Sequence, residues 1–204
     1  MGMKKAMVRT RTQQVPEGWI SRREQILELA SGLFVRHGVA QVTTRQIAAL
    51  AGISQPSLYA HFRSRDAIAV ELCCRAFAQL RERLAAAAIG SDVPSRFRAM
   101  AHIYIDFGLQ QEAAYRVAFM LDMPDQGSLD RDAVVAAGVS AFVVLRAVVA
   151  QTHADPDMAS QSAWAGLHGL VSLLLARRDF PWAERATLID HHVERQCAAL
   201  YGAG

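Results

Sequence analysis

Two helix-start signals stand eleven residues apart in this chain, at Thr43 and Ser54, with Gly52 between them. Thr43 and Gln46 have the spacing of a capping box, in which each side chain accepts a hydrogen bond from the backbone N–H of the other residue. Ser54 and Pro56 favour a second helix start, because a proline in the first turn loses no hydrogen bond. Two short helices joined by a turn that contains glycine form a helix-turn-helix unit. The local signals therefore predict such a unit in the first third of the chain.

A longer helix is predicted on each side of this unit. Ser21 and Glu24 form a second capping-box pattern, and apolar residues then recur at helical spacing until Gly38 provides a stop. This first helix supplies the third wall of a small core. Ser64 begins a long helix that ends in the alanine-rich stretch before Gly90 and leads into the rest of the chain.

Apolar residues recur at intervals of three and four through the remaining sequence, and no alternating strand pattern is sustained. The expected fold is therefore all-α, with an N-terminal three-helix helix-turn-helix domain followed by a larger helical domain. The helices expected in the larger part cover residues 94–110, 112–122, 130–153, 157–178 and 183–201.

Charge is distributed unevenly along the sequence. Residues 1–65 contain ten Lys and Arg residues against three Glu residues, a net charge of +7, which leaves −4 for the remainder of a chain whose total is +3. A cationic segment attached to a mildly acidic body is typical of a polyanion-binding module. The alternative is that the basic residues form only a solvated tail.

The cysteines and the N-terminal residues indicate where the protein works. Cys73, Cys74 and Cys197 have neither zinc-ligand spacing nor the even number of a disulfide framework, which suits a reducing compartment. Residues 1–14 are basic and polar and lack the apolar core of a signal peptide. The apolar run between Asp132 and Arg146 contains no Asp, Glu, Lys or Arg, is shorter than the ~20 residues of a membrane span and is expected to be a buried helix. We therefore expect a cytoplasmic protein that does not enter a membrane.

Polar residues gather at the starts of the two short helices. In a helix-turn-helix unit, the N-terminal residues of the second helix face base edges in the major groove. Gln55 can pair with adenine and Arg45 with guanine, while Tyr59 and His61 can donate to phosphates. The alternative is that Tyr59 packs, His61 is an ordinary surface histidine and the threonines act only as caps. The candidate DNA contacts are Thr43, Thr44, Arg45, Gln55, Pro56, Ser57, Tyr59 and His61.

Together these residues form the series Thr-Thr-Arg-Gln-Ile-Ala, Ala-Gly-Ile-Ser and Gln-Pro-Ser-Leu-Tyr-x-His-Phe-x-Ser-Arg in unbroken order. With this series of motifs, the chain from Ser21 to about Leu80 resembles the N-terminal DNA-binding domain of TetR-family regulators. The resemblance implies a phosphate contact near Arg65, where the family usually has lysine. It also implies base or phosphate contacts at Thr44, Arg45, Gln55, Pro56, Ser57, Tyr59 and His61. It also implies a homodimer, a double-stranded DNA operator and a small effector.

A second resemblance covers Trp164, His168 and Gly169, which match the Trp-x-x-x-His-Gly segment found in one subgroup of the family. Gly166 and Gly169 lie on adjacent helical turns, so another helix could approach closely there, either in a dimer or within the chain. Aromatic and methionine side chains suit a pocket for small apolar ligands, although ordinary core packing is the alternative for each. The candidate ligand contacts are Tyr104, Phe107, Phe119, Met120, Met123, Trp164 and His168.

These features predict a basic flexible arm over residues 1–20, a DNA-binding domain over 21–66 and a ligand-binding and dimerisation domain over 67–204. The expected function is that of a repressor released from a palindromic operator by a small, hydrophobic effector, with no cofactor. One alternative is a helical enzyme with a DNA-binding appendage, for which His102 and Asp106 could bind a metal but lack a third ligand. The other is a constitutive DNA-binding protein without an effector. We expect neither catalytic residues nor a metal site.

Overall fold

The computed structural model describes residues 21–90, 92–120 and 128–202, and within them it contains helices and no strands. The expected all-α fold is confirmed, with helix ends within a few residues of the predicted ones. The helices are α1 (Arg22–His37), the short 3-10 helix η1 (Val39–Gln41), α2 (Thr44–Leu50), α3 (Gln55–Tyr59), α4 (Arg65–Ala87), α5 (Val93–Gln110), α6 (Glu112–Phe119), α7 (Ser128–Val149), α8 (Pro156–Ala176) and α9 (Arg185–Tyr201). The arm expected over residues 1–20 lies outside the described residues.

Side-chain caps begin the helices of the N-terminal unit as the sequence predicts. The hydroxyls of Ser21, Thr43, Ser54 and Ser64 each accept a hydrogen bond from the backbone N–H three residues on. At Thr43 both halves of the capping box are present. At Ser21 only one half forms, and the two carboxylate oxygens of Glu24 instead accept hydrogen bonds from Arg75 at 2.8 and 2.6 Å.

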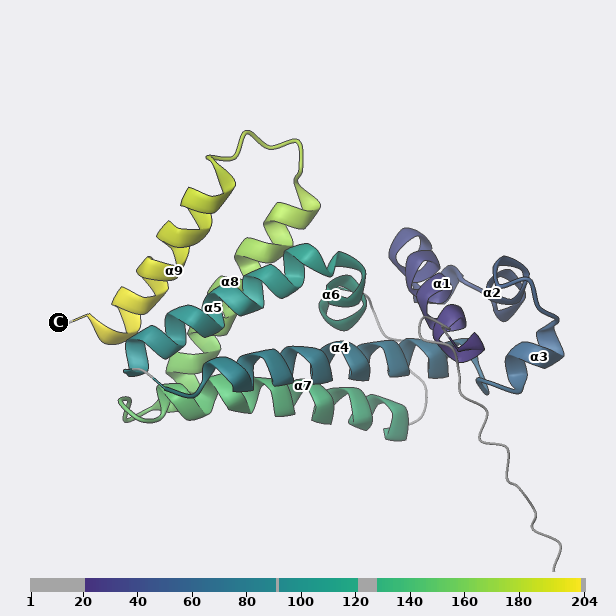
Figure 1. Ribbon diagram of the computed structural model, residues 1–204, viewed down its shortest axis with the longest axis horizontal. Coiled ribbons are helices and arrows are strands. Elements are labelled where there is room, and N and C mark those ends of the chain that lie inside the picture. Colours follow the sequence, from purple (N-terminus) through teal and green to yellow (C-terminus); the bar gives the residue numbers. More distant parts are fainter. Residues whose placement is uncertain (1–20, 91, 121–127, 203–204) are drawn as a thin grey trace, which may run out of the picture.

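The described residues form two hydrophobic clusters, and α4 contributes to both. Helices α1, α2 and α3 lie at one end of the long α4 helix, while α5, α7, α8 and α9 gather along and beyond its other part (Figure 1). In the smaller cluster, Phe34 of α1, Ile47 of α2 and Leu58 of α3 are fully buried against Ile68 of α4. The three-helix unit is therefore fixed to the N-terminal turns of α4.

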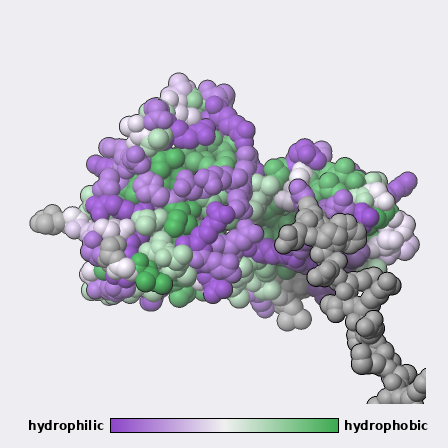
Figure 2. All heavy atoms as spheres, in the orientation of Figure 1, coloured by the Kyte–Doolittle hydropathy of each residue, from purple (hydrophilic) through white to green (hydrophobic). Residues whose placement is uncertain are grey.

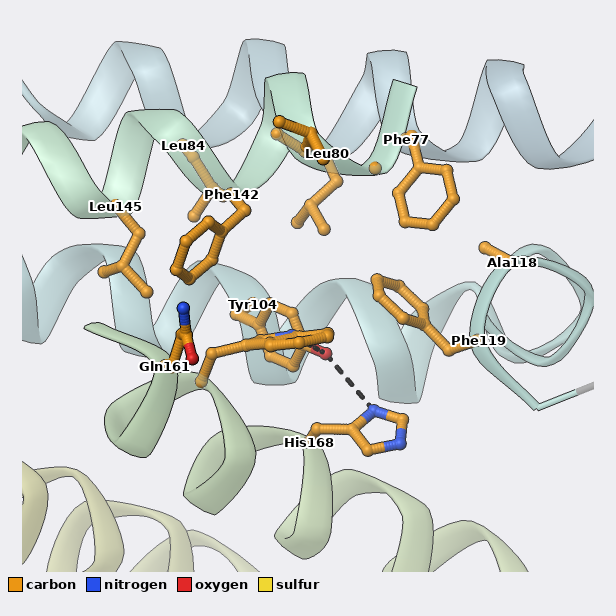
Figure 3. A pocket seen from close by; sticks show the side chains of 14 residues that line it. Phe77, Leu80, Leu84, Tyr104, Ala118, Phe119, Phe142, Leu145, Gln161 and His168 are labelled. Atoms are coloured by element: carbon orange, nitrogen blue, oxygen red, sulfur yellow. Dashed lines mark hydrogen bonds between the residues drawn. The ribbon is translucent and has the colours of Figure 1, made fainter. Parts of the chain in front are cut away.

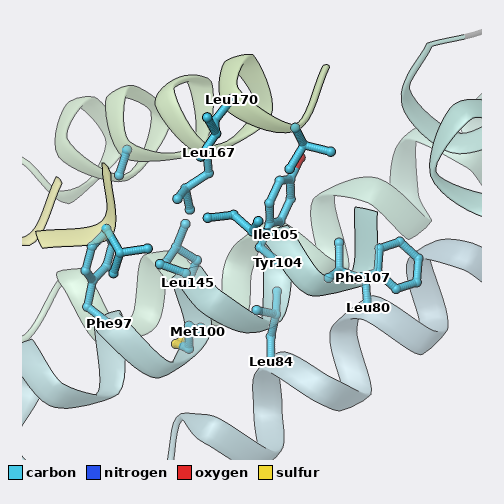
Figure 4. Packing of buried hydrophobic residues seen from close by; sticks show 14 of the residues in the cluster. Leu80, Leu84, Phe97, Met100, Tyr104, Ile105, Phe107, Leu145, Leu167 and Leu170 are labelled. Carbon is cyan, nitrogen blue, oxygen red and sulfur yellow. The ribbon is translucent and has the colours of Figure 1, made fainter. Parts of the chain in front are cut away.

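The larger cluster is built around α5. Phe97, Met100 and Ile105 of this helix are fully buried, with Leu84 of α4 and Leu167 of α8 packed around them. Figure 4 shows these side chains interdigitating between the helices. The C-terminal part of α4 thus packs in the core of the larger domain, and its N-terminal part packs in that of the smaller one.

Helix α6 lies between the two clusters. Val117 on this helix belongs to the smaller cluster and is 1% exposed. Its carbonyl oxygen accepts a hydrogen bond from the thiol of Cys73 on α4, with 3.1 Å between sulfur and oxygen. On the other side, the Nη2 group of Arg116 donates to the carbonyl of Leu175 at the end of α8, at 2.9 Å. This short helix therefore contacts both domains.

Helix α7 differs from the buried helix that its apolar sequence suggested. Only 22% of its span Arg131–Val149 is buried, because one side packs on neighbouring helices and the other faces outward. Val135, Val139 and Val143 are each about half exposed and follow one another at helical spacing. With a mean hydropathy of 2.0, α7 is the one helix in the described ranges long and apolar enough to cross a membrane, a test that core helices also pass.

Candidate functional site

The outer surface of α3 is formed by the residues that the sequence predicts to contact DNA. Gln55, Pro56, Ser57 and Tyr59 are all exposed, whereas Leu58 points inward and is fully buried. One apolar anchor therefore attaches this short helix to its core. The other side chains of the helix remain available to a partner outside the chain.

A hydrogen-bonded group links α3 to the start of α2. The Nε2 group of Gln55 donates to the Oγ1 atom of Thr44 at 3.0 Å, and the hydroxyls of Thr44 and Tyr59 lie 3.3 Å apart. These contacts are at the surface, so the polar atoms are arranged before any partner arrives. The amide oxygen of Gln55 and its second N–H are not used in this group, which leaves a donor and an acceptor free for a base.

Arg45 and His61 flank this group and are exposed. Within the part of the chain that the structure describes, neither side chain has an ion pair or a hydrogen-bond partner. The cap residue Thr43 is also exposed, and its side chain is engaged in the capping box. Arg45 and His61 are thus unengaged side chains beside α3, while Thr43 and Thr44 shape the start of α2.

Arg65 differs from these residues because its guanidinium is engaged within the chain. Its Nη1 group donates to the carbonyl oxygens of Ala40 at 2.9 Å and Val42 at 3.2 Å, and its Nε group donates to Asp66, also at 2.9 Å. The side chain therefore attaches the start of α4 to the segment that precedes α2. Among its N–H groups, those at Nη2 remain for a phosphate.

A cavity of about 500 Å³ lies in the larger domain between α4, α5, α6, α7 and α8. Figure 3 shows Phe77, Leu80 and Leu84 on one side of it and His168 on the other, with Phe119 reaching in from α6. None of the described side chains that line it is charged, and five aromatic rings and His168 form much of its wall. The cavity therefore suits a mainly apolar ligand.

Three polar side chains of the cavity wall, those of Tyr104, Trp164 and His168, belong to one continuous hydrogen-bonded chain. The Nε1–H of Trp164 donates to the hydroxyl of Tyr104 at 3.1 Å, which lies 3.3 Å from the hydroxyl of Tyr115. The Tyr115 hydroxyl lies 2.6 Å from Nδ1 of His168, whose Nε2 lies 3.1 Å from the Ser172 hydroxyl. Burial raises the pKa of Tyr115 to about 12 and also raises that of Tyr104, whereas it lowers the pKa of His168. The chain is therefore uncharged near neutral pH.

Four of the predicted ligand contacts line this cavity, namely Tyr104, Phe119, Trp164 and His168. Phe107 is fully buried in the larger core and does not line the cavity, and Met120 packs against that core, also without lining the cavity. Met123 lies outside the described residues. The sequence pattern did not indicate the contributions of α4 and α7 or that of the polar residue Gln161. The unpredicted residues are Phe77, Leu80, Leu84, Ala118, Gly138, Val139, Ala141, Phe142, Leu145 and Gln161.

The glycines at 166 and 169 of α8 have different surroundings. A Cβ atom at Gly166 would lie 2.0 Å from Nε2 of Gln196 on α9, and the Gly166 carbonyl lies 3.1 Å from Nε2 of His192. Gly169 has open space on its outer side. The close helix approach is therefore an intramolecular contact at Gly166.

The outer face of α8 carries Ala165, Gly169 and Leu173 at helical spacing. Leu173 is 51% exposed. Figure 2 shows hydrophobic residues at the surface around α8 and α9, bordered by hydrophilic ones. The other apolar side chains of α8 and α9 mostly lie in, or pack against, the chain's own core, among them Leu167, Leu170, Leu174, Ile189, Val193, Cys197 and Leu200.

The metal-binding alternative at His102 and Asp106 gains no support from the geometry. The Nε2 atom of His102 lies 3.7 Å from a carboxylate oxygen of Asp190 on α9, a contact that is an ion pair only when the imidazole is protonated. Among the described residues, no group of three or more His, Cys, Asp or Glu side chains is placed to hold a metal ion.

Comparison with known proteins assigns both parts of the chain. Residues 26–72 match the model for bacterial regulatory proteins of the tetR family, and residues 97–200 match the model for a tetracyclin repressor-like C-terminal domain. The HTH-type transcriptional repressor KstR2 of Mycobacterium tuberculosis is 46% identical over 52 residues, which are 26% of each protein. The match thus spans about a quarter of the length of this curated relative.

Solved structures resemble nearly the whole chain. The TetR family transcriptional regulator PfmR from Thermus thermophilus has a TM-score of 0.73 at 18% identity, over 91% of this chain and 99% of that one. A bacterial regulatory protein in the tetR family from Rhodococcus RHA1 has a TM-score of 0.74 at 17% identity, over 91% and 100%. These likenesses show the fold, and the C-terminal model alone covers half of the sequence. The helix-turn-helix unit and the larger helical domain match the two family models in order, and the chain therefore belongs to the TetR family of bacterial regulatory proteins.

Proposed function

We propose that this protein is a cytoplasmic, DNA-binding transcriptional repressor that a small hydrophobic effector releases from a palindromic operator. The observation that carries the proposal is the combination of an exposed, pre-arranged polar surface on α3 with an apolar cavity lined in part by α4, the helix that follows it. A solvent-facing row of polar side chains on a helix-turn-helix suits the major groove, and a cavity of this size suits a small molecule.

In the proposed complex, α3 lies in the major groove and α2 crosses the backbone. Gln55 reads an adenine with its free amide groups, and Arg45 reaches a guanine or a phosphate. Thr43 and Thr44 place the start of α2 against a phosphate, because free N–H groups and the helix dipole favour an anion there. The remaining contacts come from Pro56, Ser57, Tyr59 and His61, with Arg65 adding a phosphate contact through its Nη2 group.

Helices α4 and α6 provide the link between cavity and DNA surface. Phe77 on α4 and Phe119 on α6 pack edge to face at the cavity, with ring centroids 5.0 Å apart. Two residues from Phe119, Val117 packs into the smaller cluster. A ligand that separates the two rings would favour one arrangement of these helices over another, and it would alter DNA affinity only by binding the two arrangements unequally.

The operator's two-fold symmetry requires a second copy of the chain. We propose a homodimer that uses the outer face of α8, where Leu173 and Gly169 are uncovered, with α9 beside it. A two-fold contact pairs like surfaces and places the two α3 helices on half-sites about 34–36 Å apart, one turn of DNA. Assignment to the Trp-x-x-x-His-Gly subgroup is part of the proposal, supported by the cavity positions of Trp164 and His168.

The proposal is tested by selecting binding sites from random-sequence DNA with the full-length protein and measuring the affinity of variants for them. Gln55→Ala should cost about 1–3 kcal/mol and relax the preference at one base position. Tyr59→Ala should weaken binding, and both variants should keep their thermal unfolding midpoint because neither side chain is buried. Gln79→Ala, an exposed glutamine in the middle of α4, is the matched control. Unchanged affinity of both α3 variants would contradict the proposal.

A further inference from the structure

We propose that the cavity selects an uncharged, ring-containing molecule that presents one hydrogen-bonding oxygen to the hydroxyl of Tyr104. This inference rests on the proposed function, since it names the class of effector that the cavity takes. Three features of the described residues support it: the absence of charge in the lining, the rings around the space, and the proton arrangement of the polar chain.

The absence of charge disfavours ionic ligands in the interior. Among the described side chains that line the cavity, none is Lys, Arg, Asp or Glu. An ionised carboxylate or ammonium placed there would lose its water without gaining an opposite charge, which is strongly unfavourable. The ring of Phe119 has Phe77 at 5.0 Å, Tyr104 at 5.9 Å and Trp164 at 6.5 Å between centroids. Such walls favour planar, ring-containing molecules.

The polar chain can be protonated in two directions because neutral histidine has two tautomers. In the first, Trp164 donates to Tyr104, Tyr104 to Tyr115, and Tyr115 to Nδ1 of His168, which donates from Nε2 to Ser172. Every donor from Trp164 to His168 is then used, and the Tyr104 oxygen offers a second lone pair to a ligand hydroxyl.

In the second direction, Ser172 donates to Nε2 of His168, and Nδ1–H donates to Tyr115, which donates to Tyr104. The Tyr104 O–H is then free to point into the cavity toward a ligand carbonyl or ether. Trp164 still donates to Tyr104 in this arrangement. One hydroxyl therefore accepts from, or donates to, a single ligand oxygen, and the tautomer of His168 adjusts to either case.

Gln161 provides a second polar point at the rim. It lies on α8 three residues before Trp164 and seven before His168, a spacing that places all three on one side of the helix. Figure 3 shows its amide directed toward the cavity. Within the described ranges this amide has no hydrogen-bond partner, so it remains available to a ligand whose far end reaches the opening.

The test uses four probes that share one ring system: phenanthrene, 9-phenanthrol, 9-acetylphenanthrene and phenanthrene-9-carboxylate. Binding to the full-length protein is followed by Trp164 fluorescence in a background where the other tryptophans are phenylalanine, and by calorimetry. The phenol and the ketone should each bind about 3- to 10-fold more tightly than phenanthrene, as one net hydrogen bond requires. The carboxylate should bind more weakly than phenanthrene.

Tyr104→Phe should remove the preference for the oxygen-bearing probes while phenanthrene still binds. The matched control is Tyr201→Phe, because the buried Tyr201 hydroxyl has no hydrogen-bond partner among the described residues and lies away from the cavity. If Tyr104→Phe does not fold, the ranking of the four probes on the unaltered protein still decides the question. Tighter binding of the carboxylate, or equal binding of phenanthrene and its oxygen-bearing relatives, would overturn the inference.

Release of selected DNA by each probe is measured separately. An oxygen preference that depends on Tyr104 supports the inference whether or not the probes release DNA. If such probes bind and DNA stays bound, the proposed release of DNA by an effector is contradicted, while the inference about the cavity still holds. The two ideas therefore have distinguishable outcomes.

Discussion

The thiol of Cys73 donates a hydrogen bond to the carbonyl of Val117, and this contact joins α4 to α6 within the smaller hydrophobic cluster. Both side chains are buried in the smaller cluster. Two residues beyond Val117, the ring of Phe119 lines the cavity of the larger domain. One short helix thus presents side chains to both parts of the molecule.

Val117→Ala should separate DNA binding from the response to a ligand. Loss of the buried methyl groups should reduce the free energy of unfolding by about 1–3 kcal/mol, because a cavity is left in the smaller cluster. The α3 surface should stay intact, so DNA affinity without ligand should change little. The change in DNA affinity caused by a cavity ligand should be smaller than in the unaltered protein. If a cavity ligand changes the DNA affinity of the variant as much as that of the unaltered protein, Val117 does not transmit the effect of the ligand.

The helix starts could be predicted from the sequence because capping is local chemistry. Thr43 and Gln46 lie three residues apart, and their hydrogen bonds need no distant partner. The residues that line the cavity could not be predicted from local sequence patterns. Phe107 and Phe119 are both aromatic residues on apolar helices, yet only Phe119 lines the space, because the crossing of α4, α7 and α8 decides which ring meets a void.

The surroundings of Gly166, Arg65 and α7 also depend on tertiary packing and could not be predicted from local sequence. Two small residues on adjacent turns indicate that something approaches closely, but the approaching Gln196 comes from a helix thirty residues away. The engagement of Arg65 with carbonyls more than twenty residues earlier likewise depends on tertiary placement. The apolar sequence of α7 indicates burial, and only the packing shows which of its sides is left outward.

Arg65 and Arg45 should behave differently when substituted. Arg65→Lys keeps the charge, but an ammonium cannot reproduce a guanidinium that bonds two carbonyls and Asp66 at once, so the free energy of unfolding should fall by about 1–3 kcal/mol. Arg45→Ala should leave stability unchanged, because this exposed side chain has no partner among the described residues. It should lower the salt dependence of DNA binding by about one unit if it meets a phosphate, or relax one base preference if it reads a base.

Chemical denaturation and DNA binding at several salt concentrations measure both effects. Arg65→Lys is compared with the unaltered protein, and Arg45→Ala provides the exposed-arginine control. An Arg65→Lys variant with unchanged stability would mean that its contacts contribute nothing to the fold.

The buried His168 should make stability depend on pH. Burial lowers its pKa in the folded protein below the ordinary value of 6.5, so the unfolded chain takes up the proton first as the pH falls. The contribution to stability is therefore fully present above about pH 6.5 and is lost progressively below it. His192, whose pKa is lowered mainly by the same cause, adds an effect of the same sign. The temperature of the thermal unfolding midpoint should therefore decrease as the pH is lowered from 7.5 to 5.5.

His168→Gln removes the titrating group while keeping a side chain that can hydrogen-bond. The variant should unfold at a lower temperature than the unaltered protein at pH 7.5, because the match to Tyr115 and Ser172 is lost. Its midpoint should nevertheless fall less over the same pH interval. A parallel fall in the two proteins would assign the pH dependence to other groups.

Leu173→Glu should disrupt the proposed dimer without disturbing the subunit. Leu173 lies on the outer face of α8 with half of its surface exposed, so a glutamate is tolerated in a single chain. In a two-fold contact the same face meets its own copy, and two carboxylates would be buried near each other without positive partners, which costs several kcal/mol. The dissociation constant should rise at least about tenfold.

Ile89→Glu, an equally drastic change at an 82% exposed position after α4, is the control for Leu173→Glu and should leave association unchanged. Sedimentation at micromolar concentrations distinguishes the species, and far-ultraviolet circular dichroism confirms that each variant is folded. Because the half-sites of a palindrome are read together, Leu173→Glu should also weaken DNA binding although every α3 side chain is retained. A Leu173→Glu protein that associates as strongly as the unaltered chain would exclude this face of α8 from the interface.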